Sequence, residues 1–273
     1  MNILVALDKN YLEPLKVLIT SLLLNNPGEF FDIYVASDNL TDDDLSDVQR
    51  LCSRYESRIY LIRVEDDLFA NAPTLRYYSR AMYYRLLAAQ MLPKELDRIL
   101  YLDPDMLVIN PIRPLYETDM DDNLYAACIH KGLVNISKHV NQVRLSTYES
   151  EGYYNSGMLL MNLPAIRENV HASDIFAYAE KNRQLLVLPD QDILNGLYGK
   201  RILSLDERLW NYDIGGYSEY LLSSTGEKDM NWVMQNTAIL HFCGKHKPWH
   251  KSARGRFTAL YKHYMQISKR NMK

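Results

Sequence analysis

The sequence predicts an α/β protein built on one mostly parallel β-sheet. Short apolar segments typical of strands alternate with amphipathic helical segments through the first 108 residues, and two carboxylates directly follow one of these strands. Hydrophobic residues make up 47% of the 273 residues, which is enough to bury a large core. Strands alternating with helices imply right-handed βαβ units, and such sheets bind ligands beyond the carboxyl ends of their strands.

The first half of the chain shows the clearest periodicity. Strands are predicted over residues 2–7, 31–36 and 58–64, and helices are predicted from the apolar faces Leu15, Leu18, Ile19, Leu22, Leu23 and Leu45, Val48, Leu51, Cys52, Tyr55. Thr41 and Asp44 resemble a capping box that opens the second helix. A helix around residues 82–91 leads to a further strand that starts at Arg98. Asp8 and Asp103 each follow a strand, so both are expected at the same edge of the sheet.

The second half is less regular. Strands are predicted over residues 124–129, 158–161, 202–205 and 239–242, and helices over 173–182 and 192–198. Residues 131–152 show no periodicity, and a loop of that length in a compact domain is usually functional or mobile. No repeat or flexible linker interrupts the chain. We therefore expect one domain over residues 1–250, followed by a basic helical tail over residues 251–273.

Composition indicates a cytoplasmic protein. The first residues lack the basic, apolar and cleavage regions of a signal peptide, and no apolar stretch approaches the length of a membrane span. Cys52, Cys128 and Cys243 form an odd set within predicted helices or strands. This fits buried thiols in a reducing compartment, and we expect all three in the core.

Charge is distributed unevenly along the chain. Residues 245–273 hold nine Lys or Arg and no acidic residue, whereas the residues before them hold 22 basic and 34 acidic side chains. Phe257, Leu260, Tyr261, Tyr264 and Ile267 fall at helical spacing within this basic segment. Such a helix either lies on the anionic inner face of a membrane or packs on the body with its charged side in water. The acidic body disfavours nucleic acid as a partner.

Asp103 and Asp105 close the apolar run that starts at Arg98. Alternate residues of an extended chain point the same way, so both carboxylates can face one Mg²⁺ or Mn²⁺ ion shared with substrate phosphates. The competing interpretation is an ordinary Asp-Pro-Asp turn. His241 ends another predicted strand, either as a third ligand, which would favour Mn²⁺, or as a structural residue. Because the chain has no glycine-rich phosphate loop, a metal and side chains such as Lys247 must neutralise any phosphate.

Six motifs in a fixed order resemble glycosyltransferase family 8 along most of the chain. They are Ala6-Leu-Asp-Lys-Asn-Tyr11, Tyr84-Arg-Leu86, Leu100-Tyr-Leu-Asp-Pro-Asp105, Tyr154-Asn-Ser-Gly-Met158, Asp190-Gln-Asp-Ile-Leu-Asn195 and His241-Phe-Cys-Gly-Lys-His-Lys-Pro-Trp249. The resemblance implies a GT-A-type nucleotide-sugar-binding fold with one Rossmann-like sheet. It also implies a UDP-sugar donor, Mn²⁺ or Mg²⁺ as cofactor, and hexose transfer with retention of anomeric configuration.

The resemblance also implies a role for individual residues. Metal ligation is implied for Asp103, Asp105 and His241. Contacts with the nucleotide are implied for Ala6, Asp8, Asn10 and Tyr11 at the uridine and ribose, and for Gly244 and Lys247 at the pyrophosphate. Positions around the donor sugar, where the reaction takes place, are implied for Arg85, Asn155, Asp190 and Gln191.

The mechanism by which the anomeric configuration is retained follows less directly from the resemblance. A double displacement needs a carboxylate nucleophile on the far face of the sugar, and the amide of Gln191 is a poor nucleophile. We therefore favour front-face attack through an oxocarbenium-like state, in which the departing phosphate helps to take the acceptor's proton. Asp190 and Asp192 are the alternative covalent candidates.

The expected activity is transfer of glucose or galactose from a UDP-hexose to a glycan, a lipid-linked acceptor or a protein. His130 stands where the family pattern has an aspartate near the acceptor, and residues 131–152 show no match, so the acceptor stays open. The alternatives are a catalytically silent sugar-nucleotide-binding or interaction module on the same fold, and a nucleotidyltransferase or nucleotide-sugar hydrolase. Self-glycosylation on one of the 21 tyrosines is a further form of the transferase hypothesis.

Overall fold

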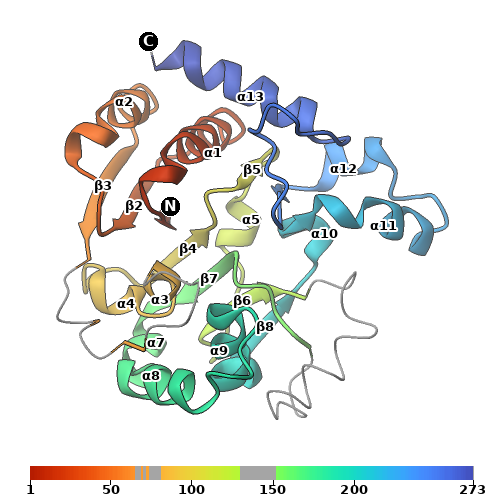
Figure 1. The fold of residues 1–273 in the computed structure, drawn as a ribbon. Coiled ribbons are helices and arrows are strands. Elements are labelled where there is room, and N and C mark those ends of the chain that lie inside the picture. Colours follow the sequence, from red (N-terminus) through yellow and green to blue (C-terminus); the bar gives the residue numbers. More distant parts are fainter. Residues whose placement is uncertain (65–68, 70–71, 74–80, 130–151, 273) are drawn as a thin grey trace.

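The computed structural model describes residues 1–64, 69, 72–73, 81–129 and 152–272 (Figure 1). The segment that contains His130 and most of the loop over 131–152 lies outside the described residues. In the part that is described, the predicted α/β architecture is confirmed: one large mixed sheet lies between layers of helices, and a smaller sheet stands beside it.

The large sheet has seven strands in the order β3-β2-β1-β4-β7-β6-β8. All neighbouring pairs are parallel except the two that involve β7, so β7 alone runs in the opposite direction. The small sheet has the order β5-β10-β9. The strands are β1 (Asn2–Ala6), β2 (Asp32–Ser37), β3 (Arg58–Arg63), β4 (Arg98–Leu102), β5 (Met106–Val108), β6 (Tyr125–Cys128), β7 (Met158–Asn162), β8 (Ile202–Leu205), β9 (Tyr212–Asp213) and β10 (Ile239–His241).

Helices cover both faces of the large sheet. They are α1 (Leu12–Leu24), α2 (Asp42–Ser53), α3 (Ala81–Tyr84), α4 (Ala88–Met91), α5 (Arg113–Tyr116), α7 (Leu163–Asn169), α8 (Ala172–Lys181), α9 (Pro189–Tyr198), α10 (Glu207–Trp210), α11 (Tyr217–Ser223), α12 (Met230–Asn236) and α13 (Thr258–Asn271), with the short 3₁₀ helices η1 (Lys9–Tyr11), η3 (Gly199–Arg201) and η4 (Ile214–Gly216). No helix among the described residues is long and apolar enough to cross a membrane.

Alternation along β1 builds the two cores. Ile3 and Val5 pack with the apolar faces of α1 and α2, whereas Leu4 and Ala6 pack on the opposite side with α3, α4 and α9. This is the two-residue period of a strand buried on both faces. The predicted capping box is confirmed, since Thr41 and Asp44 exchange the bonds that open α2.

Because β7 runs in the opposite direction, the segment that precedes it lies at the carboxyl edge of the large sheet, where the other strands place the segments that follow them. Leu102 at the end of β4 pairs with Met158 at the start of β7, so the residues that precede β7 arrive beside those that follow β4. The Asp103 backbone N–H donates to the Gly157 carbonyl oxygen across 2.8 Å. Residues 154–157 therefore share an edge with Asp8 and Asp103.

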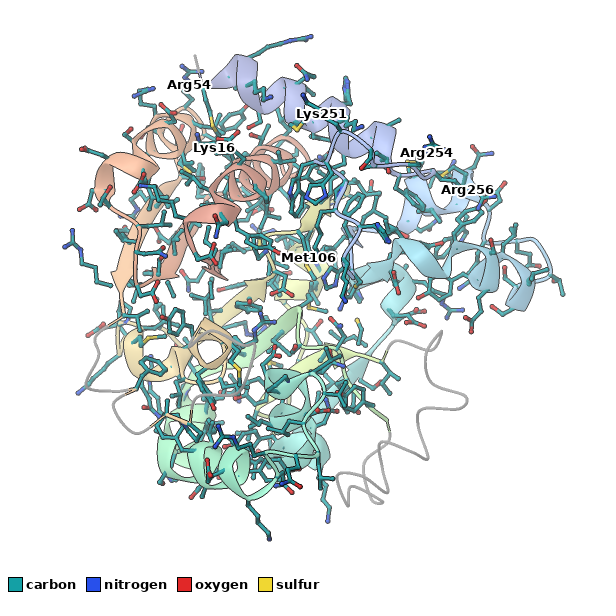
Figure 2. The ribbon with its side chains drawn as sticks, viewed as in Figure 1. Lys16, Arg54, Met106, Lys251, Arg254 and Arg256 are labelled. Atoms are coloured by element: carbon teal, nitrogen blue, oxygen red, sulfur yellow. The ribbon has the colours of Figure 1, made fainter. Side chains whose placement is uncertain are left out.

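Two predicted elements differ from the structure. The apolar run from Arg98 to Val108 forms two strands, because the chain turns at Asp103 and β5 leaves the large sheet to pair with β10. Met106 of β5 is fully buried near the centre of the molecule (Figure 2). The helix expected around 82–91 is broken into α3 and α4 by a turn at residues 85–87. The turn places Arg85 where its guanidinium donates to the Ser156 carbonyl oxygen across 3.0 Å.

The basic tail forms α13, which packs along α1. Phe257 and Tyr261 are 2% and 0% exposed in a cluster with Val17 and Phe242, so the apolar face of the helix points into the body. Lys251, Arg254 and Arg256 precede α13 and stay exposed (Figure 2). Of the two interpretations of this helix, the structure supports the one in which it packs on the body. The predicted boundary at residue 250 stays a prediction.

Candidate active site

A cavity of about 340 Å³ opens at the carboxyl edge of the large sheet. It lies where β1 and β4 end and where α9 begins, as expected for a parallel sheet. Its walls include seven of the residues that the sequence singles out: Ala6, Asp8, Tyr11, Arg85, Asp103, Asp105 and Asp190. Among the described residues, Leu7, Met82 and Pro104 also belong to the lining.

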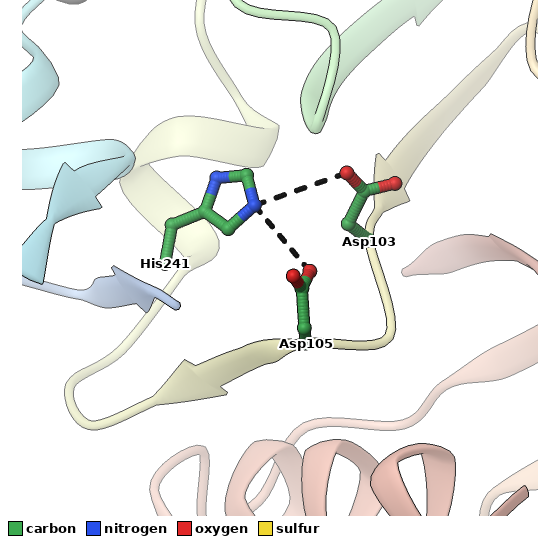
Figure 3. Close-up of side chains that lie close together, drawn as sticks. All are labelled: Asp103, Asp105 and His241. Atoms are coloured by element: carbon green, nitrogen blue, oxygen red, sulfur yellow. Dashed lines mark ion pairs between the residues drawn. The ribbon is translucent and has the colours of Figure 1, made fainter. Parts of the chain in front are cut away.

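Asp103 and Asp105 line this cavity, and His241 lies close to both carboxylates without being part of the lining (Figure 3). His241 Nε2 lies 3.3 Å from Asp105 Oδ1 and 3.8 Å from Asp103 Oδ2. One ligand atom from each residue falls within 4.8 Å of the others. Asp-Pro-Asp is therefore both a turn and a pair of convergent carboxylates, so the two interpretations of the tripeptide are compatible.

Backbone pairing fixes these three residues. The Met106 N–H closes the turn on the Asp103 carbonyl oxygen at 3.2 Å, and the Phe242 N–H donates to the Asp105 carbonyl oxygen at 3.1 Å. Because β10 runs antiparallel to β5, its last residue, His241, lies opposite Met106 and next to Asp105. The imidazole is thus positioned by sheet register rather than by a flexible loop.

Cationic side chains balance the carboxylates. Arg85 stands between two of them, with Nη2 2.9 Å from Asp103 Oδ1 and Nη1 3.3 Å from Asp190 Oδ2. Its guanidinium also lies 4.7 Å from the centroid of the Tyr101 ring, and the Tyr101 hydroxyl donates to Asp103 Oδ1 at 2.6 Å. The Lys247 ammonium donates to the Asp105 carboxylate and, at 3.0 Å, to the Phe242 carbonyl oxygen.

Burial and pairing shift the pKa values of the cluster in different directions. Burial raises the pKa of Asp103, and Arg85 offsets only part of that rise. Burial also acts to raise the pKa of Asp105, but His241 and Lys247 outweigh it and hold that pKa below the usual range. Burial acts to lower the pKa of His241, yet Cys243 and Asp105 raise it well above its ordinary value.

The donor set fits a divalent cation. Two carboxylates and one imidazole supply hard oxygens with a borderline nitrogen, and the nitrogen favours Mn²⁺ over Mg²⁺. All three side chains are less than one fifth exposed, so a cation would exchange much of its water for protein ligands while one side still faced the cavity.

The turn after β1 forms the part of the cavity wall next to the end of β4. Asp8 caps η1 by accepting a hydrogen bond from the Asn10 N–H at 2.8 Å. Asn10 itself is exposed on the surface. Tyr11 lies against Trp249 edge to face, with ring centroids 5.8 Å apart. The loop that follows β10 therefore reaches across to this turn. Gly244 in that loop has a φ of +83°, a conformation that favours glycine.

Asn155 and Gln191 lie behind the cavity wall. The Gln191 side-chain oxygen accepts from the Asn155 amide at 3.2 Å and from the Ser156 N–H at 3.3 Å. Ser156 Oγ donates to Asp190 Oδ2 at 2.9 Å, which orients that carboxylate next to Arg85. These residues come from the segment before β7 and from the first turn of α9.

Asp192 lies apart from the cavity. It is 0% exposed, and its carboxylate accepts from the Tyr153 hydroxyl and from the backbone N–H groups of Val187 and Leu188. These bonds attach the start of α9 to the segment before it and to Tyr153, which precedes β7. Asp192 thus serves the packing of α9, whereas Asp190 faces the cavity.

Four residues of the site were missed or misjudged from the sequence. Tyr101 could have been found, because it alternates with Asp103 along one face of the strand. Gly157 lies within a recognised motif without an assigned role. Asn211 gave no local signal, although it contacts His241. Cys243 was expected in the core but is only half-buried and hydrogen-bonds with His241, whereas Cys52 and Cys128 are buried as expected.

Comparison with known proteins identifies the family. Residues 2–253 match the family model described as Glycosyl transferase family 8. A lipopolysaccharide 1,2-glucosyltransferase of Escherichia coli K12 is 31% identical over 254 residues, which cover 93% of this chain and 74% of that protein. A lipopolysaccharide 1,3-galactosyltransferase of Salmonella typhimurium LT2 is 25% identical over 256 residues, which cover 91% of this chain and 73% of that protein.

A solved structure shares the fold. The structure of galactosyltransferase LgtC in complex with donor and acceptor sugar analogs superimposes with a TM-score of 0.83 at 24% identity, covering 98% of this chain and 96% of that one. The likeness extends over both sheets and the helical C-terminus.

Gly157 is the position at which a single methyl group should disturb the cluster. A Cβ there would lie 2.4 Å from His241 Cε1 and 2.8 Å from Asp103 Oδ2. We expect Gly157→Ala to weaken Mn²⁺ binding about tenfold or more, since ligand placement by neighbouring groups typically controls affinity to that extent. Thermal unfolding with and without MnCl₂ measures it as a smaller Mn²⁺-induced rise in Tm.

Gly215→Ala is the matched control, because the nearest atom to its new Cβ would be Asp213 Oδ1 at 3.3 Å, outside the cluster. Equal Mn²⁺-induced shifts in both variants and in the unaltered protein would contradict the expectation.

Proposed function

The chain belongs to glycosyl transferase family 8, and on this basis we propose that it transfers a hexose from a UDP-sugar to a glycan, lipid-linked or protein acceptor, with Mn²⁺ and with retention of anomeric configuration. Glucose and galactose are the proposed sugars, because the relatives compared above are named for these two transfers. The acceptor is left at the level of class, since His130 and residues 131–151 lie outside the described part of the chain.

The observation that carries the proposal is a cluster of two carboxylates and one imidazole whose carboxylates line an open cavity together with Asp8 and Tyr11. A metal-bound diphosphate and a nucleoside would need these groups on neighbouring walls. Asp8 can accept hydrogen bonds from a ribose or base, and the Tyr11 ring can stack on a base. Asp103, Asp105 and His241 would hold the cation, which when bound would stabilise charge on the diphosphate.

Different residues of the site are proposed to act on the leaving group and on the sugar. Lys247 can turn from Asp105 toward a diphosphate, where a cation stabilises the departing charge more strongly in the transition state than in the ground state. Arg85 holds Asp103 and Asp190 in fixed positions and closes the wall between them. Asn155 and Gln191 would position the sugar from behind the cavity wall, through Ser156 and Asp190, while Gly244 allows the backbone to approach the diphosphate.

Front-face attack is the proposed route to retention. Asp192 is fully buried and bonded within α9 and its approach, which disfavours it as a nucleophile. Asp190 lines the cavity but is bonded to Arg85 and Ser156, an environment that lowers the reactivity of a carboxylate as a nucleophile. In front-face attack the departing phosphate takes the acceptor's proton, so no protein nucleophile is needed.

Donor turnover provides the primary test. We expect release of UDP from UDP-glucose or UDP-galactose in the presence of Mn²⁺, even with water as a slow acceptor, and loss of that release in EDTA. Asp103→Asn combined with Asp105→Asn should reduce the rate about 100-fold or more. Binding of UDP without turnover of either donor, even with glycan acceptors added, would favour the catalytically silent binding module instead.

Trapping with a fluorinated donor tests the route to retention. We expect mass spectrometry of peptides after incubation with 2-fluoro-UDP-galactose or 2-fluoro-UDP-glucose to show no added hexose on the peptide that contains residues 190–192. A glycosylated Asp190 would overturn front-face attack in favour of double displacement. Intact mass after incubation with the natural donor separately detects self-glycosylation of a tyrosine.

The basic tail suggests peripheral contact with the inner face of a membrane, where lipid-linked acceptors lie. Its apolar face is occupied by the body of the protein, so such contact would depend on exposed charges rather than on insertion of the helix. Lys251 and Arg254 are exposed beside α13, and Arg54 at the end of α2 donates to the Asn271 carbonyl oxygen at the far end of α13 (Figure 2). Each basic residue near an anionic surface contributes about 1 kcal/mol to such binding.

Flotation with vesicles tests this contact. Vesicles containing phosphatidylglycerol should bind the protein at low salt and release it at high salt, and Lys251→Glu with Arg254→Glu should weaken the binding more than tenfold. Lys94→Glu with Lys181→Glu makes the same change of charge after α4 and on α8, away from α13 (Figure 1), and should bind nearly as well as the unaltered chain. Equal flotation of the two double variants would argue against the tail as the membrane-binding surface.

A further inference from the structure

Asn211 is a buried polar residue between the metal cluster and the amides behind the cavity. It is 0% exposed and immediately precedes β9, which runs parallel to β10. Its side-chain oxygen lies 2.9 Å from His241 Nδ1, and its side-chain nitrogen donates to Asn155 Oδ1 across 2.9 Å. One amide therefore connects the imidazole of the cluster with Asn155.

Two backbone N–H groups determine the direction of every bond in this connection. The Gly157 N–H donates to one end of the Asn155 side chain at 2.9 Å, and the Ser156 N–H donates to the Gln191 side chain at 3.3 Å. A backbone N–H can only donate, so the atom facing each one must be an oxygen. Asn155 then presents its nitrogen to Gln191, in agreement with the bond observed there.

The same reasoning fixes Asn211. Because Asn155 Oδ1 is an acceptor, the Asn211 atom that faces it must be the nitrogen, and the opposite end of the amide must be the oxygen. That oxygen accepts from His241 Nδ1, which must therefore carry a hydrogen. In a neutral imidazole the lone pair then lies on Nε2, the nitrogen that faces Asp103 and Asp105 (Figure 3).

We infer that Asn211 is a positioning residue that holds His241 in the tautomer able to bind a divalent cation through Nε2 and links that ligand to the Asn155–Gln191 pair. The inference rests on the proposed function for the identity of the cation and deepens it. Partners of this kind set both ring orientation and ligand basicity. Asn211 acts through its neighbours and does not line the cavity itself.

Two substitutions separate the two halves of this role. Asn211→Leu removes both bonds. Asn211→Asp keeps an acceptor for His241 Nδ1–H but removes the donor to Asn155, so metal binding and sugar positioning should be affected differently. Asn110→Leu is the matched control, because Asn110 donates to the carbonyl oxygens of Met234 and Thr237 away from the cluster.

The measurement is the Mn²⁺ dissociation constant, obtained from the electron paramagnetic resonance signal of free Mn²⁺ with the full chain. We expect Asn211→Leu to bind Mn²⁺ about tenfold to 100-fold more weakly, and Asn211→Asp and Asn110→Leu to bind within about threefold of the unaltered protein. In the Asp variant kcat should fall more than tenfold, because Asn155 loses the hydrogen bond that it accepts from Asn211. Nitrogen NMR of ¹⁵N-histidine protein with Zn²⁺ as a diamagnetic probe should show His241 protonated at Nδ1, with the resonance identified by His241→Gln.

Several results would overturn the inference. They are unaltered Mn²⁺ affinity in a folded Asn211→Leu variant, equal loss in the Leu and Asp variants, and an Nε2-protonated His241. If Asn211→Leu does not fold, the Asp variant decides: weak Mn²⁺ binding or unchanged kcat overturns the role of Asn211. Hexose transfer by a wild-type chain that does not bind Mn²⁺ would overturn this inference alone. The expected affinities with no transfer to any acceptor would overturn only the proposed function.

Discussion

Mutual repulsion among three carboxylates at one edge of the sheet is the constraint on which the rest of the site depends. Asp103, Asp105 and Asp190 face the same cavity, and two unit charges about 4 Å apart repel by roughly 4 kcal/mol at an effective dielectric constant near 20. Arg85 lies between Asp103 and Asp190, and Lys247 and His241 lie against Asp105. These side chains come from segments far apart in the sequence, so the balance of charge also links the two sheets and α9.

A second level of order comes from the backbone. The amides of Asn155, Asn211 and Gln191 could each turn by half a rotation without changing shape, and only their donors and acceptors distinguish the two orientations. The N–H groups of Ser156 and Gly157 remove that ambiguity. Because Gly157 also pairs with Asp103, one short segment before β7 sets both the place of a carboxylate and the direction of the polar network.

The sequence predicted those parts of the molecule that depend on local pattern. Short apolar runs located β1 to β4, and the Thr41–Asp44 pair located the start of α2, since both signals depend on neighbours within a few residues. The direction of β7 could not be predicted, because the apolar composition of a buried strand does not indicate whether it runs parallel or antiparallel to its neighbours. The break between α3 and α4 depends on Arg85 reaching Ser156, a contact across 71 positions.

The same division applies to the site. Asp103 and Asp105 could be predicted as site residues because they form a pair at the end of a strand, whereas the prediction of Lys247 and His241 depended mainly on the family motif. Asn211 has no signal within its own segment, since its partners are 30 and 56 positions away. A residue that orients another side chain is identified by its neighbours in the folded protein, and the periodicity of the sequence does not indicate those neighbours.

The register of β10 against β5 has a consequence for the order in which the protein becomes competent during synthesis. The carboxylate pair emerges from the ribosome long before His241 and Lys247. Asp103 can then already pair with Arg85, whereas Asp105 stays hydrated until β10 adds to β5. Contacts between such distant positions form late, after the local βαβ units. A chain stalled before residue 241 therefore contains all seven strands of the large sheet but only the two carboxylates of the cluster, so premature termination leaves the site without its imidazole.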